Sequence, residues 1–138
     1  MKLQSYYFSD SGNAKALAAA IAKEYSLKVD QIPPAYQPDR DAIVFISFDS
    51  GSVADKLRNF CRSLTPAKAK NVALAVVGKN DAGLSEVQKL LEGVGVNVFP
   101  DFYRCTLKSG LFSKGKISEE QVAEGVAWAK KLVDSYAE

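Results

Sequence analysis

The sequence contains two continuous apolar runs, residues 42–46 and residues 72–77. A strand with apolar residues at every position is covered on both faces, as in a parallel sheet between layers of helices. Each run is followed by a small polar segment and then by apolar residues at helical spacing. The chain therefore predicts an α/β fold with a mostly parallel sheet.

The remaining elements follow from the same kind of pattern. Residues 3–8 predict a first strand and residues 27–32 an edge strand, and a fifth strand starts at residues 96–99 and can continue past Pro100. The last helix has a clear start, because Ser118 and Gln121 form a capping box pattern. Helical spacing predicts four helices, marked by Leu17, Ile21 and Tyr25; by Val53, Leu57, Phe60, Cys61 and Leu64; by Leu84, Val87, Leu91 and Val94; and by Val122, Val126, Ala129, Val133 and Tyr136.

Residues 33–40 carry three prolines and can form neither a helix interior nor a central strand. If the second strand is an edge and the third lies beyond the first, the chain must cross a diagonal of about 20 Å. Eight residues can span up to about 26 Å. We therefore expect a helix-free crossover between strands 2 and 3.

The composition of the chain limits the number of domains and the classes of partner that we expect. A chain of 138 residues with 47% hydrophobic content predicts a single domain, residues 1–138. A net charge of +2, with scattered basic residues, does not indicate a nucleic-acid partner. No apolar run reaches the roughly 20 residues that cross a bilayer, and no signal peptide is visible, so we expect no membrane partner.

The two cysteines and the lack of histidine limit which metal sites and catalytic groups the chain can form. Cys61 and Cys105 form no CxxC pair, and two unpaired thiols predict a reducing, cytoplasmic setting. The absence of histidine argues against a usual zinc site and a histidine-based triad. We assign no metal ligand and no catalytic residue. Cys61 and Trp128 are expected to be packing residues.

The loop after the first strand combines small hydroxyl residues with a glycine before a helix. Backbone N–H groups at a helix start, together with the helix dipole, suit a phosphate or another anion. The alternative is an ordinary helix entry, with Ser11 or Asn13 as the N-cap.

This loop resembles the signature of the flavodoxin-like family. The residues are Ser9, Asp10, Ser11, Gly12, Asn13 and Ala14, and they match four of the five specified positions of Ser/Thr-x-Thr/Ser-Gly-Asn-Thr. Residues 101–105 and 114–120 are similar to the ending of small flavodoxin-like domains. The resemblance implies a three-layer sandwich with a five-stranded parallel sheet of order 2-1-3-4-5, and flavin mononucleotide (FMN) bound by its phosphate at the first loop.

The resemblance also implies which residues bind the cofactor. They lie in the loops after strands 1, 3 and 4: Ser9, Asp10, Ser11, Gly12, Asn13, Ala14, Phe48, Asp49, Ser50, Gly51, Gly78, Lys79, Asn80 and Asp81. The family usually places aromatic residues on both sides of the flavin ring. In this chain the two later loops offer only Phe48, and Ala14 lacks the usual hydroxyl.

Two main hypotheses follow. The first is an FMN-binding redox or electron-transfer protein, whose acidic redox partner docks near Lys108, Lys114 and Lys116. The second is a flavodoxin-fold binding or interaction domain that has lost FMN. A third class, phosphotransfer, rests on Asp49 at the end of strand 3, but the acidic pair and the lysine that a response-regulator receiver needs are missing.

Overall fold

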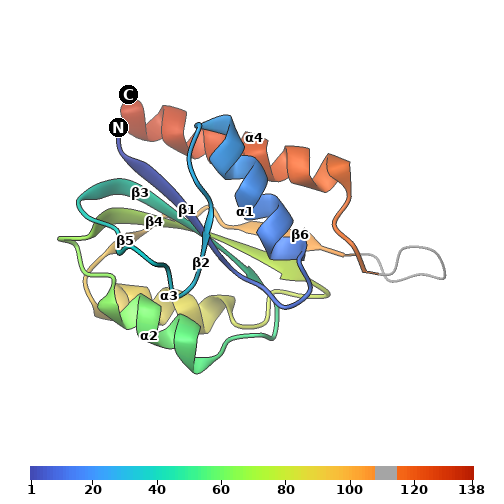
Figure 1. Ribbon diagram of the computed structural model, residues 1–138, viewed down its shortest axis with the longest axis horizontal. Coiled ribbons are helices and arrows are strands. Elements are labelled where there is room, and N and C mark those ends of the chain that lie inside the picture. Colours follow the sequence, from blue (N-terminus) through green and yellow to red (C-terminus); the bar gives the residue numbers. More distant parts are fainter. Residues whose placement is uncertain (108–114) are drawn as a thin grey trace.

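The computed structural model describes residues 1–107 and 115–138. The described residues form six strands and four helices (Figure 1). In chain order these are β1 (Leu3–Phe8), α1 (Asn13–Glu24), β2 (Asp30–Gln31), β3 (Asp41–Asp49), α2 (Asp55–Ser63), β4 (Ala69–Gly78), α3 (Leu84–Gly93), β5 (Asn97–Val98), β6 (Tyr103–Thr106) and α4 (Glu119–Ala137).

All strand pairs are parallel, and the sheet order is β2-β1-β3-β4-β5. Helices α1 and α4 cover one face of the sheet, and α2 and α3 cover the other (Figure 1). Strand β2 pairs with β1, and residues 33–40 cross to β3 without a helix. The predicted three-layer α/β fold and its helix-free crossover are confirmed.

Four predicted strands have different bounds in the structure. Strand β4 is Ala69–Gly78 rather than residues 72–77. The edge strand is only Asp30–Gln31 rather than residues 27–32. The fifth strand is divided into β5 and β6, which both pair with β4, because residues 99–102 around Pro100 interrupt the ladder. Strand β3 continues to Asp49, where we expected a loop from Ser47, because its polar end still pairs with β1 and β4.

Strand β3 carries a buried side chain to each face in alternation. Val44, Ile46 and Phe48 belong to the core under α2 and α3, and Ile43 and Phe45 belong to the core under α1 and α4. This period of two is the geometry of a strand covered on both faces.

The predicted packing residues lie in these cores. The ring of Trp128 on α4 meets Phe45 edge-on, with ring centroids 5.9 Å apart. Cys61 on α2 is fully buried in the opposite core. Both residues are therefore structural, as expected.

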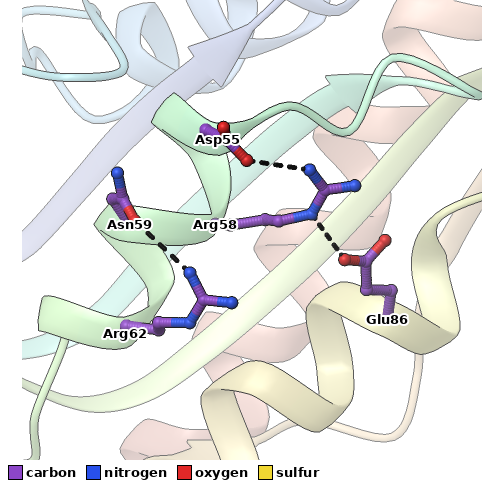
Figure 2. Close-up of polar contacts among 5 residues, drawn as sticks. All are labelled: Asp55, Arg58, Asn59, Arg62 and Glu86. Atoms are coloured by element: carbon purple, nitrogen blue, oxygen red, sulfur yellow. Dashed lines mark hydrogen bonds and ion pairs between the residues drawn. The ribbon is translucent and has the colours of Figure 1, made fainter.

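A surface network joins α2 to α3 on the outer side of their layer. Arg58 donates to Asp55 at 3.1 Å and to Glu86 at 2.7 Å (Figure 2). Arg62 donates to Asn59 within α2 at 3.3 Å. Exposed ion pairs of this kind contribute little to stability, so the buried core supplies most of the α2–α3 association.

The start of α4 agrees with the prediction from the sequence. The Ser118 hydroxyl accepts from the Gln121 N–H, and the Gln121 side chain accepts from the Ser118 N–H. This is the predicted capping box. Among residues 1–107 and 115–138, no helix has the length and apolar character needed to span a membrane.

Asp41 is a buried carboxylate at the amino end of β3. Its side chain is fully buried, and neither oxygen has a hydrogen-bond partner among the described residues. Lys2 Nζ lies 3.5 Å away as an ion-pair partner. Burial raises the pKa of Asp41 above its ordinary value of 3.8, although the charge of Lys2 opposes that rise.

Replacing Asp41 by Asn should therefore change how stability depends on pH. Because the folded pKa is raised, the contribution of Asp41 is complete below pH 3.8 and is lost as the pH rises through the folded value. Asn does not titrate. We expect the unfolding free energy of D41N, relative to the wild type, to increase from acid to neutral pH in urea titrations.

The matched control is Asp134→Asn, which removes an exposed carboxylate on α4. D134N should follow the wild type across the same pH range. A difference between D41N and the wild type that stays constant with pH would contradict the assignment.

Candidate functional site

The loops after β1, β3 and β4 meet at the carboxyl edge of the sheet and border a half-open cavity of about 440 Å³. Open α/β sheets bind ligands at this edge, where the strand order reverses. The cavity is lined by Asp10, Ser11, Asn13, Asp49, Ser50, Gly51, Ser52, Val77, Gly78, Lys79, Asn80, Ala82, Leu107 and Gly115.

Close contact between the β3 and β4 loops forms one wall of this cavity. The N–H of Ser50 donates to Val77 O at 2.9 Å, and the N–H of Gly51 donates to Ala82 O at 3.1 Å. A Cβ atom on Gly78 would overlap the Ser50 hydroxyl and would lie 2.8 Å from the Ser50 Cβ, closer than real Cβ atoms approach. The approach of the two loops therefore requires glycine at position 78.

Helix α1 begins without a side-chain cap of its own. Gly12 is the N-cap, with a φ of 89° that favours glycine, so the alternative in which Ser11 or Asn13 is the N-cap is wrong. Asn13 instead joins α1 to the segment before α4. Its Nδ2 donates to Gly115 O at 2.8 Å, and its Oδ1 accepts from the Ile117 N–H at 3.0 Å.

The carboxylate of Asp49 lies inside the loop that precedes α1. Oδ2 accepts from the N–H of Asp10, from the N–H of Ser11 and from the Ser11 hydroxyl, each at 2.9 Å. Oδ1 accepts from the Ala14 N–H at 3.2 Å. The Ser9 hydroxyl reaches both oxygens, at 3.0 and 2.9 Å. Asp49 is only 6% exposed.

The two serine hydroxyls extend this network to the remaining N–H groups. Ser9 Oγ accepts from the Gly12 N–H, and Ser11 Oγ accepts from the Asn13 N–H, both at 3.1 Å. Every backbone N–H from residue 10 to residue 14 therefore donates to Asp49 directly or through a serine. We call this set, the five N–H groups with the Ser9 and Ser11 hydroxyls, the anion site.

A phosphate group does not fit the anion site in this structure. The donors that would bind it are already hydrogen-bonded to Asp49 or to the two serines. A phosphate beside Asp49 would also meet a like charge, and two unit charges 4 Å apart near a protein surface interact by about 4 kcal/mol. The residues that the resemblance implies for the FMN phosphate are brought together, but an internal carboxylate occupies the position.

The predicted site residues separate into two groups. Those that line the cavity are Asp10, Ser11, Asn13, Asp49, Ser50, Gly51, Gly78, Lys79 and Asn80, and those that do not are Ser9, Gly12, Ala14, Phe48 and Asp81. Phe48 is fully buried in the core under α2 and α3, and Asp81 pairs with Arg104 at 3.2 Å.

The sequence analysis missed five lining residues: Ser52, Val77, Ala82, Leu107 and Gly115. Leu107 follows β6 and Gly115 precedes α4, and residues 114–120 had been singled out only as a family likeness. Of the three lysines predicted to dock a partner, Lys116 is exposed, and Lys108 and Lys114 lie outside the described residues.

The cavity has few of the groups that flavin stacking or nucleophilic catalysis uses. None of its lining residues in the described part of the chain is aromatic. Asp49 is buried with both oxygens hydrogen-bonded, which does not suit a phosphoacceptor. Burial raises the pKa of the Cys61 thiol to about 12 and also raises the pKa of Cys105. Among the described residues, no group of three possible metal ligands is present.

Comparison with known proteins supports the fold. No family model matches the chain, and no curated protein matches it. A solved flavodoxin from the domain Archaea aligns over 100% of both chains, with a TM-score of 0.74 and 15% identity. Oxidised flavodoxin 2 from Bacillus cereus aligns over 95% of this chain and 99% of its own, with a TM-score of 0.58 and 17% identity. The protein has a flavodoxin-like fold.

Replacing Asn13 by Ala should loosen the attachment of α1 to the segment before α4. The change leaves the part-buried Gly115 O and Ile117 N–H without the Asn13 side chain as a partner. We expect a loss of about 1–3 kcal/mol in the free energy of unfolding, measured by urea denaturation.

Asn59→Ala is the matched control, because Asn59 is exposed on α2 and its side chain accepts one hydrogen bond from Arg62 (Figure 2). N59A should stay within about 0.5 kcal/mol of the wild type. Equal losses in the two variants would contradict the bridging role of Asn13.

Proposed function

We propose that this protein is a flavodoxin-fold binding domain that does not hold FMN through its phosphate. One observation carries the proposal. The Asp49 carboxylate takes the hydrogen bonds of the loop that binds the phosphate in the family that the sequence resembles. The lack of aromatic residues in the described cavity lining supports the same conclusion.

The cavity indicates the kind of molecule that the domain would bind. Its volume of about 440 Å³ falls within the usual range of about 300–1,000 Å³ for small-molecule sites. Ser50, Ser52 and Asn80 supply hydrogen-bonding side chains, and Val77 and Leu107 supply apolar surface. Asp10 and Asp49 make the β1 side unfavourable for an anion. The ligand is therefore a small hydrogen-bonding molecule without a phosphate group on that side.

The second candidate is an FMN-binding electron-transfer protein. The cavity lies at the carboxyl edge beside β1 and β3, and two solved flavodoxins share the fold; both observations favour this candidate. Asp49 would then have to leave the anion site when FMN binds. A redox partner that docks near Lys116 belongs to this candidate, as does an oxidoreductase activity. A cytoplasmic setting suits either candidate, since Cys61 and Cys105 are both free.

Titration with FMN and riboflavin distinguishes the two candidates. The two ligands share the flavin ring and differ in the phosphate. Charge-assisted hydrogen bonds contribute about 1.5–3 kcal/mol each, so one such bond to the phosphate would favour FMN by about tenfold or more. For the wild-type protein we expect FMN to bind no more tightly than riboflavin, as measured by flavin fluorescence and absorbance.

Failure of both flavins to bind at high micromolar concentration also supports a domain that has lost FMN. A preference for FMN of about tenfold or more would overturn the proposal and support the electron-transfer candidate. Flavin absorbance of the protein as purified provides an independent check, because tightly bound FMN would be retained.

A further inference from the structure

We propose that Asp49 is an internal substitute for a bound phosphate, and that removing its carboxylate opens the anion site to an external phosphate group. This inference rests on the proposed function, in which the wild-type chain takes no phosphate there. It goes further because it assigns the exclusion of phosphate to the side chain of Asp49.

The side-chain direction of Asp49 follows from its place on β3. Ile43 and Phe45 point to the face under α1, and residues two apart on a strand share a face. Asp49 lies an even number of residues after Phe45 on the same strand, so its side chain points to the same face. In the register of the sheet, Phe8 at the end of β1 is paired with Phe48, so Asp49 lies one residue beyond, beside the loop that leaves β1. Strand pairing therefore directs the carboxylate toward the start of α1.

The anion site is more complete than an ordinary helix cap. A capping side chain usually comes from the N-cap residue and accepts from one or two N–H groups. Here the N-cap is Gly12, and the acceptor comes from a residue 35–40 positions away on another strand. The N–H groups of residues 10, 11 and 14 and the two serine hydroxyls donate to it, and the N–H groups of residues 12 and 13 donate to those hydroxyls. A set of this size exceeds what one carboxylate needs and suits the three terminal oxygens of a phosphate monoester.

In the wild type, the Asp49 carboxylate is favoured over an external phosphate as the acceptor in the anion site. Asp49 is held on a buried strand, so its carboxylate is always close to the donors, as a tethered ligand is. An external phosphate must displace it or share the site with a like charge. Replacing Asp49 by a smaller neutral residue removes both obstacles and leaves every donor of the anion site in place.

The experiment compares Asp49→Ser with the wild type and with Asp55→Ser. Asp55 is an exposed aspartate on α2, so D55S makes the same chemical change outside the anion site (Figure 2). Thermal unfolding midpoints are measured in inorganic phosphate and in chloride of equal ionic strength. We expect phosphate to raise the midpoint of D49S by about 3 °C or more, and to leave the wild type and D55S unchanged.

Two further variants test where the phosphate binds. Adding Ser9→Ala and Ser11→Ala to D49S removes both hydroxyls of the anion site and should abolish the phosphate effect. D49S should also bind FMN at least about tenfold more tightly than riboflavin if it binds flavins. The inference is overturned if folded D49S shows no phosphate effect, or if the wild type is stabilised as much as D49S.

Folding of D49S is itself informative, because the loss of Asp49 leaves the N–H groups of residues 10, 11 and 14 without their acceptor. If D49S does not fold in chloride, refolding in phosphate should restore native circular dichroism, and failure to do so overturns the inference. Failure of the proposed function gives a different result, namely tight FMN binding by the wild type. The two ideas can therefore fail separately.

Discussion

Burial of β3 on both faces is the constraint on which the other elements depend. Its alternate side chains enter two separate cores, one under α1 and α4 and the other under α2 and α3. Its edges are paired to β1 and β4 along nearly their whole length. Because such a strand has no face left for solvent, helices must cover both sides of the sheet. The polar loops then collect at the carboxyl edge.

The two ends of β3 show how position decides the state of a buried carboxylate. Asp41 and Asp49 share a strand and a face, and both are buried. At the amino end, Asp41 has an ion-pair partner in Lys2 but no hydrogen bond among the described residues, and its pKa is raised. At the carboxyl end, a loop and a helix start supply donors to Asp49. Parallel strands followed by helices place free N–H groups at that end only.

In this protein the fold and the ligand-binding site depend on different residues. The flavodoxin-like fold is shared with solved structures at 15–17% identity, which shows the architecture and not the ligand. The site depends on single side chains. One aspartate at the end of β3 occupies the donors that the first loop would otherwise offer to a phosphate. We expect a change of one residue at such an edge to alter what can bind without altering the sheet.

Local patterns in the sequence determined the fold class, the order of elements, the helix-free crossover at residues 33–40 and the capping box at Ser118, because each depends on neighbouring residues. They also indicated the first loop as a candidate anion site. Tertiary structure alone decided that Asp49 would occupy it. Continuation of β3 past its apolar run depends on pairing with β1 and β4, and the partners of Asp49 lie 35–40 residues away in the sequence. No local pattern carries that information, since only the order of strands brings the end of β3 beside the loop that leaves β1.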